Sequence, residues 1–182
     1  RYERMQTRVF ENEFNGVQYV ADIICRMIKN HGENASARDI YEELPPFVLG
    51  LTTGRTPLGL YRELVRRYQA GEVSFKNVAV YSLDEFYPIR RTDQQSRNFR
   101  IYDDFLTHID IAPENVHMLD GTISEREVSE YCAEYEKSIR KIDLMIIGFG
   151  EQGQIGFNEQ GSYAKSHTRL VELSHNSRKT QS

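Results

Sequence analysis

The chain has 182 residues, of which 39% are hydrophobic and 27% charged, and its 23 basic against 27 acidic residues give a net charge of −4. This length suits one domain, and 11 Tyr and 9 Phe supply enough apolar surface for a core, which excludes wholesale disorder. The mild acidity argues against general nucleic-acid binding, and no window approaches the roughly 18 apolar residues that span a bilayer.

The two cysteines, Cys25 and Cys132, lie far apart and lack the spacing of a metal or redox site. We therefore expect two reduced, buried thiols in a cytoplasmic protein. The first four residues, RYER, do not form a signal peptide.

Hydrophobic spacing predicts the first elements of the chain. Apolar residues recur at steps of three and four over residues 15–31, which predicts a helix, and a polar loop is expected at 30–34. The apolar run 47–51 follows two prolines and predicts a buried strand. Thr56 and Pro57 then fit a hydroxyl N-cap and a proline at the first helical position, so a second helix is expected there.

The rest of the chain continues this alternation of strands and helices. The pattern Ser124-x-x-Glu127 is a capping box and predicts a helix start. Strands separated by helices are typical of an α/β fold with a parallel sheet that is covered on both faces. The other expected elements are a helix over 96–107 and strands over 78–83, 116–119, 143–148 and, more weakly, 169–173.

The loop over residues 52–56 is a candidate anion site. Ligands of open parallel sheets bind beyond the carboxyl ends of the strands, and this loop joins a buried strand to a helix start. The first amides of that helix lack internal partners, Gly54 permits close approach, and Arg55 adds a positive charge, which together suit a phosphate. An ordinary strand–helix turn would show the same local pattern, and the Gly-Lys-Ser/Thr ending of a Walker A loop is absent.

Two adjacent carboxylates, Asp84 and Glu85, follow the predicted strand 78–83 directly. At a strand's carboxyl end they would lie at the mouth of the ligand crevice. A carboxylate in a partly apolar pocket can serve as a proton-transfer base, whereas a solvated acidic turn is the alternative. Of the two, we expect Glu85 to point towards neighbouring helix amides or water.

The segment 148–153 matches the dinucleotide fingerprint GxGxxG and follows a predicted strand. An NAD-binding oxidoreductase is therefore one hypothesis. The fingerprint must open a helix, however, and residues 154–162 contain two further glycines and an asparagine, which make a poor helix start. We favour a long glycine-rich active-site loop.

The five histidines show no metal-ligand spacing, and neither a metal motif nor a G-x-S-x-G hydrolase motif is present.

Four segments taken together resemble glucosamine-6-phosphate deaminases. FVLGLTTGRTP at 47–57 resembles their phosphate loop, and the stretch 70–87 contains AGEVSFKNV and ends in LDEFY. HIDIAPEN lies within the matching stretch 105–119, and IGFNE at 155–159 resembles the active-site loop. The Phe-Asn-Glu ending favours the deaminases over the related 6-phosphogluconolactonases. The matches keep their order and spacing over about residues 15–178.

The resemblance implies a three-layer α/β/α fold with a mainly parallel, Rossmann-like sheet that is truncated at its C-terminus. We expect residues 1–182 to form a single domain of this type and to be a fragment of a longer protein. The implied substrate is a hexosamine 6-phosphate, which family enzymes isomerise from aldose to ketose with release of ammonia, giving fructose 6-phosphate in N-acetylglucosamine catabolism. No cofactor, nucleic acid or membrane is implied, and a homo-oligomer is permitted.

The same resemblance assigns roles to individual residues. Asp84 matches the carboxylate that moves a proton between sugar carbons, and Glu159 matches a ring-opening carboxylate. Ser162 and Arg169 match a site for an allosteric sugar phosphate, but Val171 replaces its lysine. The implied substrate contacts are Thr52, Thr53, Gly54, Arg55, Thr56, Glu85 and Asn158.

The active-site loop departs from the family at two catalytic positions. Gln152 stands where the family carries Asp, and Gln154 stands where it carries His. Glutamine cannot gain or lose a proton near neutral pH. Gln160 also replaces a proline, and Arg55 replaces a small residue in the phosphate loop. The alternative hypothesis is therefore a catalytically degenerate domain that binds a sugar phosphate or regulates a larger, deacetylase-fused protein.

Overall fold

The computed structural model describes residues 6–35, 44–150, 153–175 and 177–178, to which the structural statements below refer. Within these residues the strands form one parallel sheet in the order β3-β2-β1-β4. The α/β fold with a parallel sheet is confirmed. The strands are β1 (Phe47–Leu51), β2 (Val78–Ser82), β3 (Val116–His117) and β4 (Leu144–Met145).

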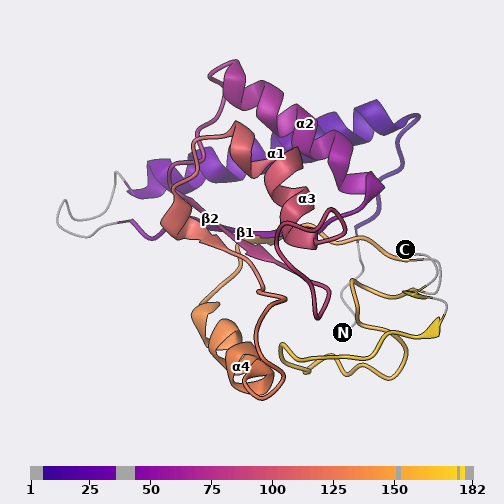
Figure 1. Cartoon of the computed structure of the whole chain (residues 1–182). Helices are drawn as coiled ribbons and strands as arrows, with labels where there is room; N and C mark the ends of the chain where they lie inside the picture. The colour runs from indigo at the N-terminus through magenta and orange to yellow at the C-terminus, as the bar shows by residue number, and fades with distance from the viewer. Residues whose placement is uncertain (1–5, 36–43, 151–152, 176, 179–182) are drawn as a thin grey trace.

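Helices cover both sides of the sheet. Figure 1 shows α1, α2 and α3 on one side and α4 on the other, which gives three layers. Two short 3₁₀ helices, η1 (Leu106–His108) and η2 (Pro113–Asn115), lead from α3 to β3. The α-helices are α1 (Glu13–Ala35), α2 (Arg55–Gln69), α3 (Arg97–Asp104) and α4 (Val128–Ser138).

The expected polar loop at 30–34 is wrong, because α1 continues through it. Polar residues alone do not end a helix, and this stretch contains no proline. The ring Nε2 of His31 lies 2.8 Å from the carbonyl oxygen of Pro45, so this part of α1 is bonded to the segment that enters β1.

Two helix starts also differ from the expectation. Gly54, not Thr56, precedes α2, and its φ of 124° is a conformation that glycine adopts readily, so the helix begins at Arg55 without a side-chain cap. Helix α4 begins at Val128, because the carbonyl of Ser124 accepts the amides of Glu127 and Val128 in a preceding turn. The side chains of Ser124 and Glu127 bond to each other rather than to helix amides.

The expected strand over 169–173 is wrong, since these described residues form no regular structure. This segment finds no partner strand among the described residues. A strand requires an adjacent backbone as well as a suitable side-chain pattern.

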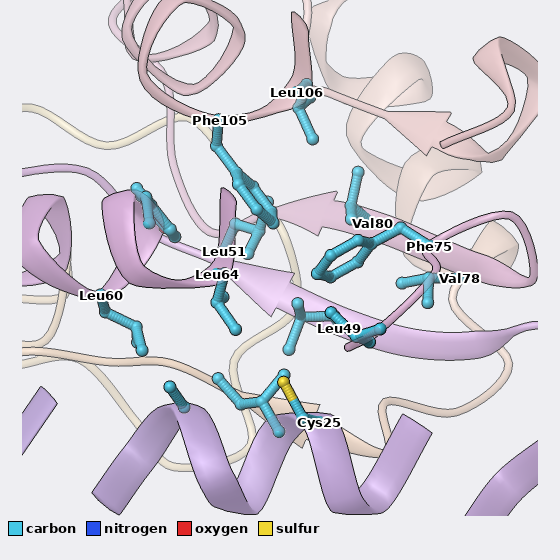
Figure 2. Close-up of a cluster of buried hydrophobic side chains, with 14 of the residues drawn as sticks. Cys25, Leu49, Leu51, Leu60, Leu64, Phe75, Val78, Val80, Phe105 and Leu106 are labelled. Atoms are coloured by element: carbon cyan, nitrogen blue, oxygen red, sulfur yellow. The ribbon is translucent and has the colours of Figure 1, made fainter. Parts of the chain in front are cut away.

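The core lies between the sheet and helices α1, α2 and α3 (Figure 2). Phe105 stacks on Tyr61 with ring centres 5.1 Å apart and meets Phe75 edge-on at 5.4 Å. Every residue of β2 is buried, as expected for a central parallel strand. Leu51 pairs with Ser82, so β1 and β2 end side by side and their following loops start together.

The cysteines are both free, which confirms the expectation of two unpaired thiols; Cys25 is buried as expected, whereas Cys132 is only half-buried. Burial raises the pKa of each thiol, so both stay protonated and weakly reactive. In the described part of the chain, no helix has the length and apolar character needed to cross a membrane.

Candidate functional site

A groove of about 990 Å³ opens beyond the carboxyl ends of β1 and β4. One wall is the loop 52–56, and another is the segment that follows β4, including Gln154. Asp84 and Arg97 also line the groove. Thus the structure brings together the two sites that the sequence placed at neighbouring strand ends.

The start of α2 gives this groove groups that suit an anion. Among the hydrogen bonds within the described residues, none uses the backbone amides of residues 53–56. Arg55 and Thr56 are exposed, whereas Thr52 is buried and its carbonyl accepts the hydroxyl of Tyr61. Free amides at a helix N-terminus carry a partial positive charge and suit a phosphate group.

Asp84 lies opposite this loop, with 11% of its side chain exposed. Burial raises its pKa to about 6; the Arg97 guanidinium opposes this rise and Glu85 adds to it. Gly156, with a φ of +56°, packs directly on the carboxylate, since a Cβ there would lie 2.8 Å from Oδ2 of Asp84. A carboxyl group that titrates near neutral pH can accept and return a proton.

Glu85 is directed away from the groove, as expected. Its carboxylate accepts the amides of Phe86 at 2.8 Å and of Arg97 and Asn98 at 2.9 Å each. It also accepts the hydroxyl of Ser96 at 2.7 Å. The carboxylate therefore anchors the N-terminus of α3 and lies outside the groove, and its implied contact with the substrate stays a prediction.

Among the described residues of the segment after β4, 146–150 and 153–174, tight turns occur and no helix is present. The amide of Gly150 donates to the carbonyl of Gln154, and the amide of Gly153 donates to that of Gly150, both at 2.9 Å. A Cβ on Gly150 would lie 2.1 Å from Nε2 of Gln154, so that side chain packs against the glycine. This geometry favours an active-site loop over a dinucleotide site. Gln152 lies outside the described residues.

Glu159 does not line the groove. Hydrogen bonds from Ser177 and Ser174 lower its pKa, and the Ser174 amide and hydroxyl lie 2.9 and 3.1 Å from its carboxylate. The residue that matches a ring-opening carboxylate is therefore bonded to the segment around residue 174.

The residues matched to an allosteric site do lie together. Arg169 Nη2 lies 3.0 Å from the Ser162 hydroxyl and 3.2 Å from Oδ1 of Asn158. Arg169 and Asn158 border a second cavity of about 670 Å³, which Glu85 also borders. Asn158, expected at the substrate, is thus placed with this pair rather than in the groove.

Sequence reasoning missed Arg97. Its Nε lies 3.9 Å from Oδ1 of Asp84, and its guanidinium carbon lies 4.8 and 5.4 Å from the ring centres of Phe86 and Phe157. The sequence offers one signal for its position: Arg97 directly follows Ser96, whose hydroxyl caps α3 by accepting a backbone amide. In the described part of the chain, no three or more His, Cys, Asp or Glu side chains are grouped to hold a metal ion.

The sequence is similar to named proteins along most of its length. A family model described as glucosamine-6-phosphate isomerases/6-phosphogluconolactonase matches residues 20–182. A Candida albicans protein named glucosamine-6-phosphate isomerase is 40% identical over 172 residues, which are 93% of this chain and 64% of that protein. A Caenorhabditis elegans glucosamine-6-phosphate deaminase is 37% identical over 172 residues, 93% of this chain and 60% of that one.

The fold is also similar to solved structures. A monomeric glucosamine-6-phosphate deaminase matches with a TM-score of 0.82 and 32% identity, covering 94% of this chain and 66% of that one. A 6-phosphogluconolactonase from Plasmodium vivax matches with a TM-score of 0.61 at 19% identity, over 91% of this chain and 58% of that one, and shows the fold alone. The chain therefore spans less than two thirds of the length of each of these four proteins.

Proposed function

The chain belongs to the glucosamine-6-phosphate isomerase/6-phosphogluconolactonase family, and on this premise we propose that it acts on a hexosamine 6-phosphate as a glucosamine-6-phosphate deaminase. The observation that carries the proposal is a single groove that holds the free amides of residues 53–56 and the buried Asp84. The first group suits the phosphate, and the second suits proton transfer at the sugar.

The proposed chemistry uses these groups in sequence. The amides of residues 53–56 and the Arg55 guanidinium hold the phosphate. In the open-chain aldose, Asp84 takes the proton from C2, which gives an enediol-type intermediate, and returns a proton to C1. The carbon–nitrogen double bond that results at C2 is hydrolysed by water, which releases ammonia and leaves fructose 6-phosphate.

A second candidate function is sugar-phosphate binding with slow or absent deamination. Two observations favour it: Gln154 lines the groove without a titratable proton, and Glu159 is bonded to Ser174 outside it. Amide groups can still donate to and accept from sugar hydroxyls. Binding can therefore persist where ring opening is slow.

A cytoplasmic location forms part of the proposal. The free thiols of Cys25 and Cys132 support it, because such thiols persist in reducing compartments. Measurement of the protein's distribution between cytoplasmic and membrane or secreted fractions tests it.

Removal of the Arg55 charge is expected to weaken phosphate binding. If the guanidinium makes a charge-assisted bond, Arg55→Ala loses about 1–3 kcal/mol, or about 5- to 150-fold in affinity for inorganic phosphate and glucosamine 6-phosphate. Isothermal titration calorimetry measures both. Arg62→Ala is the matched control, since Arg62 is an exposed arginine of α2 outside the groove. Equal affinity of Arg55→Ala and Arg62→Ala for phosphate would show that Arg55 faces only solvent.

The reaction class is tested by product analysis. The protein is incubated with glucosamine 6-phosphate, and ammonia and fructose 6-phosphate are quantified. Formation of both in equal amounts supports the deaminase proposal, and binding without products supports the second candidate. Hydrolysis of 6-phosphogluconolactone without affinity for glucosamine 6-phosphate would contradict both.

A further inference from the structure

The two adjacent carboxylates at the end of β2 have different partners. Glu85 accepts two amides and a hydroxyl from the start of α3, one of them the amide of Arg97 at 2.9 Å. Asp84 instead lines the groove. Glu85 therefore fixes the backbone of Arg97 beside Asp84, so that the arginine side chain starts close to that carboxylate.

Two aromatic rings then fix the arginine side chain. The guanidinium carbon of Arg97 lies 4.8 Å from the ring centre of Phe86 and 5.4 Å from that of Phe157, and the two ring centres are 5.0 Å apart. Phe86 follows β2 and Phe157 belongs to the segment after β4, so the contact joins three parts of the fold. Only 16% of the arginine side chain is exposed, so the rings act on a largely desolvated cation.

Among the described residues, the charges that face Asp84 come from few groups. Glu85 lies on its own loop, Arg97 lies on α3, and Tyr61 lies on α2 with its hydroxyl kept neutral by burial. The described residue of the β4 loop that packs on the carboxylate is Gly156, which carries no charge. Arg97 is thus the cation that opposes both the burial of Asp84 and the charge of Glu85.

The distance between the pair matters as much as the charge. Arg97 Nε lies 3.9 Å from Oδ1 of Asp84, which is beyond hydrogen-bond length. At this distance the positive charge of the guanidinium favours the ionised form of Asp84. The lone pairs of the Asp84 oxygens remain available to accept a proton. A direct two-bond ion pair would occupy the oxygens that must accept the substrate proton.

We propose that Arg97 is a positioning residue that, held against the rings of Phe86 and Phe157, keeps the Asp84 carboxylate ionised and free to accept a proton. This inference rests on the proposed function only in assigning proton transfer to Asp84. The electrostatic interaction between Arg97 and Asp84 is present in the ligand-free protein and does not depend on the substrate.

The test is a titration of the Asp84 side-chain carboxyl carbon by NMR in the ligand-free protein. Arg97→Gln is expected to raise the pKa of Asp84 by at least ~1, because a cation within about 4–6 Å is lost. Arg97→Lys, which keeps the charge, is expected to recover most of the difference. Arg100→Gln is the matched control: it removes the same charge from an exposed position of the same helix and is expected to leave the titration unchanged.

An unchanged Asp84 titration in Arg97→Gln, or an equal change in Arg100→Gln, would overturn the proposal. If Arg97→Gln does not fold, Phe157→Leu removes one ring and keeps the charge; it is expected to raise the pKa of Asp84 by a smaller amount, and no rise would overturn the proposal.

Phosphate affinity of the same variants separates this role from ligand binding. Arg97→Gln is expected to bind inorganic phosphate as the wild type does. A loss as large as that of Arg55→Ala, with the Asp84 titration unchanged, would make Arg97 a phosphate ligand and overturn the proposal. Failure of glucosamine 6-phosphate to bind would contradict the proposed function, but it would not alter the titration.

Discussion

Asp84→Asn is expected to abolish exchange of the C2 proton of glucosamine 6-phosphate with solvent while leaving its affinity for the sugar phosphate intact. Asparagine keeps the shape of the side chain but cannot accept the proton. A positioned base contributes about 10²–10⁴-fold to such a step, so any exchange that remains in deuterated water should be slower than in the wild type by at least that factor. Proton NMR of the C2 signal measures it, and persistent exchange in the variant would rule Asp84 out.

The same substitution is expected to stabilise the fold at neutral pH. Burial raises the pKa of Asp84 from 3.8 to about 6, so folding at neutral pH carries the cost of a buried charge. The difference corresponds to about 3 kcal/mol at most, and this figure already includes the opposing attraction to Arg97. Urea unfolding at pH 8 should show this increase in the free energy of unfolding.

The sign of the pH dependence follows from which state holds the proton more tightly. Between about pH 4 and pH 6 the folded protein keeps a proton on Asp84 that the unfolded chain loses, so wild-type stability falls as pH rises. The advantage of Asp84→Asn should therefore be complete above pH 6 and vanish below about pH 4. An advantage that is equal at pH 4 and pH 8 would contradict the raised pKa.

Asp143 supplies a matched control of opposite sign. Burial raises its pKa, but hydrogen bonds from Lys141 and the Val48 amide outweigh that effect and leave the pKa below its usual value. Its contribution to stability is therefore present at neutral pH and lost as the pH falls below the usual aspartate range. Asp143→Asn should lower the free energy of unfolding at pH 8, where Asp84→Asn raises it.

The double substitution Gln152→Asp and Gln154→His is expected to raise the rate of deamination. Ring opening needs one proton removed from a sugar oxygen and another delivered to the ring oxygen. Gln154 lines the groove but cannot transfer protons, and an acid–base group there would lower the barrier by about 3–5 kcal/mol. Ammonia release should therefore increase by about 10²–10⁴-fold if the rest of the site is intact.

The matched control keeps amides at both positions. Gln152→Asn with Gln154→Asn changes side-chain length without adding an acid or base, and it should not increase ammonia release. Wild-type turnover in the ordinary range of ~1–10³ per second would contradict the degenerate-site hypothesis. Another residue would then have to supply the proton.

The sequence was sufficient to place the loop 52–56 and Asp84 near each other. The sequence predicts strands over residues 47–51 and 78–83, which correspond to β1 and β2. Parallel strands present their carboxyl ends on one edge of the sheet. Adjacent strands, with Leu51 paired to Ser82, then bring the two following loops together. Hydrophobic patterning and the alternation with helices indicate the strands and their parallel direction, and consecutive strands are usually neighbours in such sheets.

The remaining features of the site depend on tertiary contacts that local patterns do not record. Arg97 reaches Asp84 because Glu85 anchors α3 and two distant phenylalanines hold the guanidinium. Glu159 lies outside the groove because its hydrogen-bond donors come from Ser174, 15 residues further along the chain. Helix α2 starts earlier than expected, because its first residue is set by the backbone conformation of Gly54 and not by the hydroxyl of Thr56.

The most direct test of the account is to locate bound glucosamine 6-phosphate by amide NMR titration. We predict that the largest saturable shifts occur at the amides of Thr53, Gly54, Arg55 and Thr56, with a further shift at Asp84. Inorganic phosphate should displace the sugar phosphate and reproduce the shifts at the four loop amides. The absence of shifts, or shifts centred on the second cavity around Glu136 and Arg169, would contradict the claim that the groove is the sugar-phosphate site.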